Sequence, residues 1–125
     1  MNIRPIISIG LSTFDRPKFL KEAVSSVLNQ SFQNFELIIS NDYIKAPVTF
    51  KSLGIEKDQR IKILNRKKNL GELKNLNFML SLAKGEWFLW LADDDLLHPD
   101  FLSTFYNTSK KREFSRSVGF FSNFI

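Results

Sequence analysis

The feature that most constrains this chain is an alternation of short apolar segments with longer segments of helical periodicity. Residues 6–11 are nearly all apolar and rich in isoleucine, which is typical of a strand buried on both faces of a sheet. Between residues 19 and 28 the apolar side chains instead recur every three or four positions, which predicts an amphipathic helix. We therefore predict an α/β fold, a mostly parallel sheet between two layers of helices, in a single domain over residues 1–125.

The other predicted elements continue this alternation. Further strands are expected at residues 35–40, 60–64, 87–91 and 117–125, with a short helix after Pro47. A second long helix opens at residues 69–71 and closes at Lys84-Gly85, where glycine is a common stop, and a third helix starts at His98-Pro99. The second long helix carries one predicted apolar stripe, formed by Leu73, Leu76, Met79, Leu80 and Ala83.

Polar residues follow four of the predicted strands. Ligands of parallel α/β sheets bind at the carboxyl ends of the strands, which all meet at one edge. The residues at these ends are Ser12 to Asp15, Asn41-Asp42, Asn65-Arg66 and Asp93 to Asp95. We expect these four groups to gather at the same edge of the sheet.

The triplet Asp93-Asp94-Asp95 directly follows a strongly apolar strand. Adjacent carboxylates repel each other, and at the end of a buried strand they are costly unless a cation compensates them. Mg²⁺ and Mn²⁺ bind oxygen ligands of this kind, commonly together with substrate phosphates and water. Capping of the helix near Pro99 is the structural alternative, but one aspartate is enough for a cap. The triplet therefore favours a metal or phosphate site.

Several other polar residues have both a binding and a structural interpretation. Asp42 can accept a hydrogen bond from a ligand or close an Asx turn, and Ser12 and Thr13 can bind a sugar or cap a helix. Lys74 and Arg66 can neutralise a diphosphate, although solvated side chains of these types are more common.

For three residues near the predicted helices, a structural role is either the favoured interpretation or as plausible as a binding role. Asp15 precedes Arg16-Pro17 and is favoured as a helix cap, and His98 is favoured as a helix-start residue. Asn77 lies on the second long helix, where it either faces the edge of the sheet or is exposed to solvent.

Composition excludes several classes of site. The chain has no cysteine and one histidine, which excludes disulfides, thiolate zinc sites, cysteine nucleophiles and His-rich metal sites. The net charge is +5, but the basic residues are dispersed, except at residues 66–68 and 110–112, so we expect no nucleic-acid partner. We predict neither a signal peptide nor a membrane span, and we expect a soluble, cytoplasmic protein.

Five motifs occur in order over about residues 5–106. They are Ser12-Thr13-Phe14-Asp15, the segment 23–32 that contains Asn29-Gln30-Ser31-Phe32, the segment 35–42 that ends in Asp42, the stretch Asn69-Leu70-Gly71 with Asn77 and residues 83–87, and Asp93-Asp94-Asp95 followed by Pro99. Together they resemble the nucleotide-binding half of family-two glycosyltransferases of the GT-A type. The resemblance implies a Rossmann-like GT-A fold and transfer of a sugar from a nucleotide-sugar to an acceptor hydroxyl.

The resemblance also implies roles for individual residues. Ser12 and Thr13 line the base and ribose pocket, and Asp42 contacts the base, commonly uracil. Asp93 lies near the ribose or the metal, and Asp94 or Asp95 coordinates a Mn²⁺ or Mg²⁺ ion that bridges the diphosphate. The implied nucleotide-sugar site comprises Ser12, Thr13, Phe14, Asp15, Asp42, Lys74, Asn77, Asp93 and Asp94, and the implied metal ligands are Asp93, Asp94 and Asp95.

The chain departs from the family pattern in two motifs and in its last 25 residues. With Pro99 as the anchor, Ala92 stands where the family has the first aspartate of its metal motif, and residues 41–43 replace an Asp-Asp-Gly-Ser turn. The family's acceptor site and catalytic base lie beyond the metal motif. Glu113 is the only carboxylate after residue 100, and we do not expect it to be that base.

Two functions remain open from the sequence. The first is the donor-binding half of a hexosyltransferase-like enzyme, in a partial catalytic domain. Its expected partners are a UDP-linked sugar and a sugar or lipid-linked acceptor, in cell-surface polysaccharide biosynthesis at the inner face of the membrane. The second is a non-catalytic nucleotide-binding or interaction module that keeps the fold without an acceptor site. A phosphoacceptor receiver domain is disfavoured, because its acidic pair follows the first strand rather than the fourth.

Overall fold

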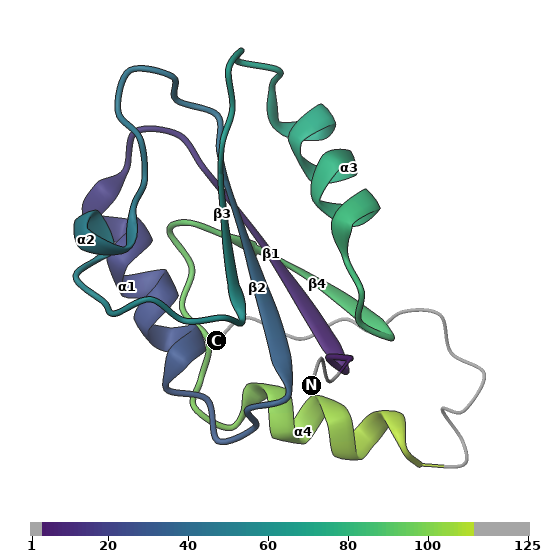
Figure 1. The fold of residues 1–125 in the computed structure, drawn as a ribbon. Helices are drawn as coiled ribbons and strands as arrows, with labels where there is room; N and C mark the ends of the chain where they lie inside the picture. Colours follow the sequence, from purple (N-terminus) through teal and green to yellow (C-terminus); the bar gives the residue numbers. More distant parts are fainter. Residues whose placement is uncertain (1–3, 112–125) are drawn as a thin grey trace.

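The computed structural model describes residues 4–111, which form a parallel sheet with helices on both of its faces (Figure 1). The strands are β1 (Ile7–Thr13), β2 (Phe35–Asn41), β3 (Ile61–Asn65) and β4 (Trp87–Ala92). The helices are α1 (Pro17–Leu28), α2 (Phe50–Leu53), α3 (Glu72–Leu82) and α4 (Phe101–Ser109). The predicted order of elements and the parallel α/β architecture are confirmed, and the predicted strand at 117–125 lies outside the described residues.

The strand order is β3-β2-β1-β4, so β1 is central and has β2 and β4 as its neighbours. Ser12 of β1 is in register with both Ser40 of β2 and Ala92 of β4. The last residues of these three strands therefore lie side by side at the carboxyl edge, while β3 lies one strand further away. This arrangement determines which of the four predicted polar groups can share a site.

The main core lies on the face of the sheet that α1, α2 and α4 cover. Alternate residues of β1 and β2, such as Ile9 and Leu37, are completely buried there, because successive side chains of a strand point to opposite faces. The buried stripe of α1 packs against them, and α4 contributes the fully buried Leu102. The predicted helical periodicity of residues 19–28 is thus confirmed, except that Phe19 is 49% exposed.

Helix α3 covers the opposite face, where the predicted apolar stripe is partly wrong (Figure 1). Leu73 and Leu80 are 71% and 44% exposed, and the residues that α3 buries are Asn75 and Met79. The buried side of α3 is therefore half polar, because the residue that contacts β2 there is Asn75, which forms hydrogen bonds to β2, and not a leucine. A Cβ on Gly10 would lie 2.5 Å from Phe88 and 3.4 Å from Met79, so this strand glycine allows close packing beneath α3.

A buried carboxylate ties the segment between α3 and β4 to the rest of the sheet. Glu36 of β2 accepts hydrogen bonds from the Ser8 hydroxyl (2.5 Å) and from the backbone N–H of Lys84 (2.7 Å). The backbone N–H of Gly85 donates to the same Ser8 hydroxyl at 2.8 Å. These bonds set where β4 begins, and so they also set the position of the aspartates that come after β4.

The segment between β4 and α4 is held at its other end by Gln30, which is 2% exposed. Its amide Nε2 donates to the carbonyl of His98 (2.7 Å), and its Oε1 accepts from the N–H of Leu102 (3.0 Å). His98 lies just before α4 and accepts a hydrogen bond from the N–H of Asp100, which confirms its predicted place at a helix start. Within residues 4–111, no helix has the length and apolar character needed to cross a membrane.

Candidate functional site

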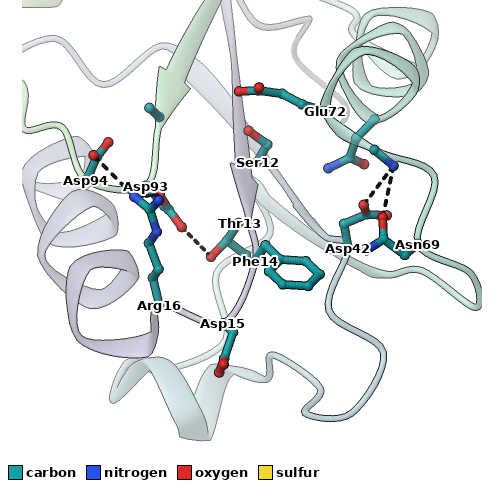
Figure 2. Close-up of a pocket in the computed structure, with 13 residues that line it drawn as sticks. Ser12, Thr13, Phe14, Asp15, Arg16, Asp42, Asn69, Glu72, Asp93 and Asp94 are labelled. Carbon is teal, nitrogen blue, oxygen red and sulfur yellow. Dashed lines mark hydrogen bonds and ion pairs between the residues drawn. The ribbon is translucent and has the colours of Figure 1, made fainter.

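A pocket of about 700 Å³ lies at the carboxyl edge of the sheet, between the ends of β1, β2 and β4 and the start of α3 (Figure 2). This volume is in the range of pockets that bind small molecules and cofactors. The lining residues are Ser12, Thr13, Phe14, Asp15, Arg16, Asp42, Asn69, Gly71, Glu72, Asn75, Ala92, Asp93 and Asp94. Three separated strand ends therefore contribute to one site, as the parallel topology requires.

The β4 side of the pocket holds a compact group of charges. The Thr13 hydroxyl donates to Asp93 Oδ2 at 2.9 Å, and Arg16 Nη1 lies 3.5 Å from Asp93 Oδ1. The same Arg16 nitrogen lies 3.2 Å from Asp94 Oδ2. The Asp93 side chain is 9% exposed, whereas the side chains of Asp94 and Arg16 are 50% and 49% exposed. Asp93 is thus a fixed, buried carboxylate, and Asp94 is open to a ligand.

The β2 side of the pocket is built around Asp42, which is 6% exposed. Its two carboxylate oxygens accept hydrogen bonds from the backbone N–H groups of Leu70 (2.9 Å) and Gly71 (3.0 Å). A carboxylate beside the first turn of a helix is favourable because the unpaired N–H groups there carry partial positive charge. Asp42 therefore fixes the start of α3 against β2 and still faces the pocket.

Asn75 forms the floor of the pocket beside β2. It is 1% exposed, its Oδ1 accepts from the Ser40 hydroxyl, and its Nδ2 donates to the carbonyl of Ser40 at 3.2 Å. On the β4 side, the indole N–H of Trp90 donates to the Ser12 hydroxyl at 3.2 Å. The hydroxyls of Ser12 and Ser40 are thus both oriented by side chains from neighbouring elements.

The turn after β1 forms the outer wall. The Phe14 ring is 48% exposed and packs edge-to-face on Tyr43, with 5.1 Å between the ring centroids. Asp15 adopts φ = 52°, a left-handed conformation that aspartate adopts more readily than most residues, and Figure 2 shows its side chain pointing away from Asp93 and Asp42. In this turn the Phe14 ring, and not the Asp15 carboxylate, is therefore the group available to a ligand.

The structure places seven of the predicted site residues in this pocket: Ser12, Thr13, Phe14, Asp15, Asp42, Asp93 and Asp94. Lys74 and Asn77 are exposed residues of α3 and do not line it. Asp95 also lies outside the lining, and its N–H closes a turn onto the carbonyl of Ala92 directly after β4. The prediction that all four strand ends gather at one edge is confirmed, since Asn65 of β3 is in register with Asn41 of β2 and accepts a hydrogen bond from it at 3.0 Å. Asn65 and Arg66 nevertheless line a separate cavity of about 470 Å³ beside β3 and not this pocket.

Sequence reasoning did not assign a binding role to six lining residues: Arg16, Asn69, Gly71, Glu72, Asn75 and Ala92. A signal was present for Asn75, because it lies four residues before Met79 and so on the same helical face. For residues 69–72, the signal was their place at the start of a helix whose N–H groups open onto the edge of the sheet. Nothing in the sequence showed that the Arg16 side chain would contact Asp93 and Asp94.

The carboxylates can be tested against the divalent ion that the family resemblance implies. The described part of the chain holds no group of three or more Asp, Glu, His or Cys side chains placed to bind a metal, so the triplet does not act as a three-carboxylate cage. Asp93 and Asp94 nevertheless converge on one cationic group, Arg16. Mg²⁺ and Mn²⁺ are commonly held by one or two carboxylates, with phosphate and water supplying the other ligands. The donor set therefore fits a divalent ion that is completed by a phosphate-bearing ligand.

Comparisons of the sequence with known proteins give one consistent result. Residues 8–122 match the family model described as glycosyl transferase family 2. An uncharacterized glycosyltransferase of Haemophilus influenzae is 29% identical over 97% of this chain and 38% of its own length. A GalNAc(5)-diNAcBac-PP-undecaprenol beta-1,3-glucosyltransferase of Campylobacter jejuni is 36% identical over 80% of this chain and 33% of its own. The chain thus spans about a third of the length of these two relatives.

Solved structures agree on the fold. The structure of TarS residues 1–349 from S. aureus in complex with UDP-GlcNAc has a TM-score of 0.71 at 23% identity, over 83% of this chain and 31% of that one. The mannosyltransferase PcManGT from Pyrobaculum calidifontis, in complex with GDP-Man and Mn²⁺, has a TM-score of 0.72 at 16% identity, over 88% of this chain and 34% of that one. The chain therefore has the GT-A fold that these transferases share.

Proposed function

The chain belongs to glycosyl transferase family 2, and from this premise we propose that its carboxyl-edge pocket binds the nucleoside diphosphate part of a nucleotide-sugar together with a divalent ion. The observation that carries the proposal is the convergence of Thr13, Asp93 and Asp94 with Arg16 in the pocket of about 700 Å³. That group combines hard oxygen ligands with a cation suited to phosphate. Neither the cavity beside β3 nor the shallow groove beside α1 combines these groups.

In this proposal the β2 side of the pocket binds the base and ribose, and the β4 side binds the diphosphate. The exposed Phe14 ring offers the base a surface for stacking, and Asp42 beside it offers carboxylate lone pairs to a base N–H or a ribose hydroxyl. The diphosphate then lies toward Asp94, on the β4 side. The N–H groups of Leu70 and Gly71, just before α3, are already bonded to Asp42, so they are not assigned to the phosphate.

A divalent ion, Mn²⁺ or Mg²⁺, would be held by Asp94, with Asp93 behind it. When bound, the ion supplies a Lewis acid that stabilises the negative charge on a departing nucleoside diphosphate. Asp93 has its orientation fixed by the Thr13 hydroxyl, and Asp94 is the half-exposed carboxylate of the pocket. We assign Asp94 as the primary ligand and Asp93 as the residue that raises the negative potential beside it. Asp95 is not assigned to the metal.

We further propose that the full reaction is transfer of a hexosyl group from the nucleotide-sugar to an acceptor hydroxyl. Because this chain spans about a third of the length of its relatives, the acceptor site and the base for that reaction are not assigned to described residues. Uracil is the first candidate base, with guanine as the second, since neighbours of the same fold are in complex with UDP-GlcNAc and GDP-Man. For the acceptor, we propose a lipid-linked molecule at the membrane face.

A thermal-shift panel of nucleoside diphosphates tests this proposal. We expect UDP, or else GDP, at about 100 times its Kd to raise the melting temperature by about 10 °C in the presence of Mn²⁺, because binding at that concentration adds about 2.7 kcal/mol to the free energy of unfolding. The shift should shrink when EDTA replaces Mn²⁺. ADP and CDP serve as matched ligands of the same charge. Equal shifts for all four diphosphates, or none with Mn²⁺, would refute a base-selective, metal-dependent site.

A further inference from the structure

One guanidinium nitrogen occupies the space between the two pocket carboxylates. Arg16 Nη1 lies 3.5 Å from Asp93 Oδ1 and 3.2 Å from Asp94 Oδ2, and Figure 2 shows the arginine reaching toward both aspartates from the start of α1. Arg16 is far in sequence from Asp93 and Asp94, and the pairing of β1 with β4 brings it close to them. The protein therefore already holds a positive charge where the proposed divalent ion would bind.

The arginine is placed so that it can leave this position. Arg16 precedes the first residue of α1, and its backbone carbonyl is held by the N–H of Leu20 at 2.9 Å, so the main chain is anchored. The side chain is 49% exposed, and within residues 4–111 its hydrogen bonds and ion pairs go to Asp93 and Asp94 alone. The guanidinium can move into solvent, or onto a ligand in the pocket, without breaking contacts elsewhere.

Electrostatics makes the arginine and a divalent ion competitors. Two adjacent carboxylates, one of them buried, are stabilised by a nearby cation. A divalent ion on Asp94 would stand within a few ångströms of the guanidinium, and like charges at that distance repel strongly where water is partly excluded. In the observed arrangement Asp94 can therefore form an ion pair with Arg16 or bind the metal, but not both.

We propose that Arg16 is a built-in counter-ion that a divalent ion must displace from Asp93 and Asp94, and that a bound diphosphate accepts the displaced guanidinium. Arginine binds phosphate oxygens in a bidentate manner, so the diphosphate offers it a new partner. Metal binding is then weak in the absence of nucleotide and strong in its presence, which is a positive coupling between two ligands of one pocket. This inference rests on the proposed function of the pocket.

The test is a Mn²⁺ titration followed by electron paramagnetic resonance of free Mn²⁺, with and without UDP or GDP. We expect Arg16→Gln to bind Mn²⁺ about five- to tenfold more tightly than the wild type in the absence of nucleotide, as removal of one partly exposed competing charge implies. The same substitution should weaken nucleotide binding and reduce the gain in Mn²⁺ affinity that nucleotide produces. Arg16→Lys keeps the charge, so its Mn²⁺ affinity in the absence of nucleotide should remain within about twofold of the wild type, whereas its nucleotide affinity should fall because lysine lacks the bidentate contact to phosphate.

Lys18→Gln is the matched control, because it removes one positive charge from an exposed residue of α1 that does not line the pocket. The counter-ion role would be overturned if Arg16→Gln bound Mn²⁺ no more tightly than the wild type in the absence of nucleotide. It would also be overturned if Lys18→Gln raised the Mn²⁺ affinity over the wild type as much as Arg16→Gln does. Either result would leave the proposed function intact. No Mn²⁺ binding by any of these proteins, even with nucleotide, would overturn the proposed function and this inference with it. Circular dichroism melts of each variant verify that it is folded.

Discussion

Replacing Asp94 with asparagine is expected to weaken Mn²⁺-dependent binding of UDP or GDP by about 100-fold, since loss of a charged ligand should cost at least as much as the 10- to 100-fold losses known for supporting residues of metal sites. Asp94 is the half-exposed carboxylate of the pocket, and asparagine keeps its size while removing its charge. The substitution leaves Asp93 and its bond to Thr13 in place, so the fold at the end of β4 should be unchanged. Calorimetric titration with Mn²⁺, and with EDTA in its place, measures the loss.

Asp95→Asn is the matched control for this prediction. Asp95 is adjacent in sequence and has the same side chain, but it does not line the pocket, so its substitution should change nucleotide affinity by less than about threefold. The reverse result, in which Asp95→Asn abolishes binding and Asp94→Asn does not, would contradict the assignment of the ligand from pocket geometry. It would instead favour an arrangement of the triplet in which Asp95 faces the pocket.

Replacing Gly85 with alanine is expected to lower the free energy of unfolding by about 3 kcal/mol, near the upper end for overpacked sites. A Cβ at this position would lie 2.7 Å from both the backbone N and the hydroxyl Oγ of Ser8, and 3.0 Å from the carbonyl of Ile6. Two of these three atoms are backbone in or next to β1, so they cannot move aside cheaply. Relief of the clash would also break the Gly85–Ser8 bond, next to the Glu36–Lys84 bond that positions β4.

Gly54→Ala provides the comparison for Gly85→Ala. Gly54 ends α2 with φ = 70° and has open space around its Cβ position, so alanine there should cost only about 1 kcal/mol of conformational strain. Urea denaturation of the two variants, with the slope of the transition unchanged, measures the difference. Similar losses in both variants would show that steric contact with β1 does not dominate at Gly85.

Short apolar strands and helical stripes were sufficient to predict the order of elements, because each is a local pattern with a direct structural meaning. The parallel sheet could be inferred from that order, and it correctly placed Thr13, Asp42 and Asp93 at one edge. The strand order was not predicted. That order explains why Asn65 and Arg66, at the end of the outer strand β3, belong to a different cavity.

The finer errors come from rotations that the sequence pattern does not determine. Each residue of a helix turns the side-chain direction by about 100°, so the choice between Asn75 and Asn77 decides whether an amide faces the sheet or solvent. In α3 the buried bond of Asn75 to Ser40 favours the former and leaves Leu73 and Leu80 exposed. In the same way, the turn after β4 separates Asp94 from Asp95, although the two residues are chemically equivalent in sequence.

Some motifs that resemble the family support the site without lining it. Gln30 fixes the segment between β4 and α4, and Gly85 permits the close approach of β4 to β1. Both act on the two ends of the segment that carries Asp93 and Asp94. The role of Gln30 and Gly85 is therefore structural, whereas the proposed chemistry belongs to the carboxylates and Arg16.

The location of the nucleotide site is tested most directly by a two-dimensional ¹H–¹⁵N NMR titration with UDP or GDP in the presence of Mg²⁺. We predict that the amide signals that shift belong to residues 12–16, Asp42, residues 70–71 and residues 93–94. Signals of residues 63–68, in the separate cavity beside β3, should stay in place. Shifts that cluster at residues 63–68 and spare Thr13 and Asp94 would contradict a nucleotide site at the carboxyl ends of β1, β2 and β4.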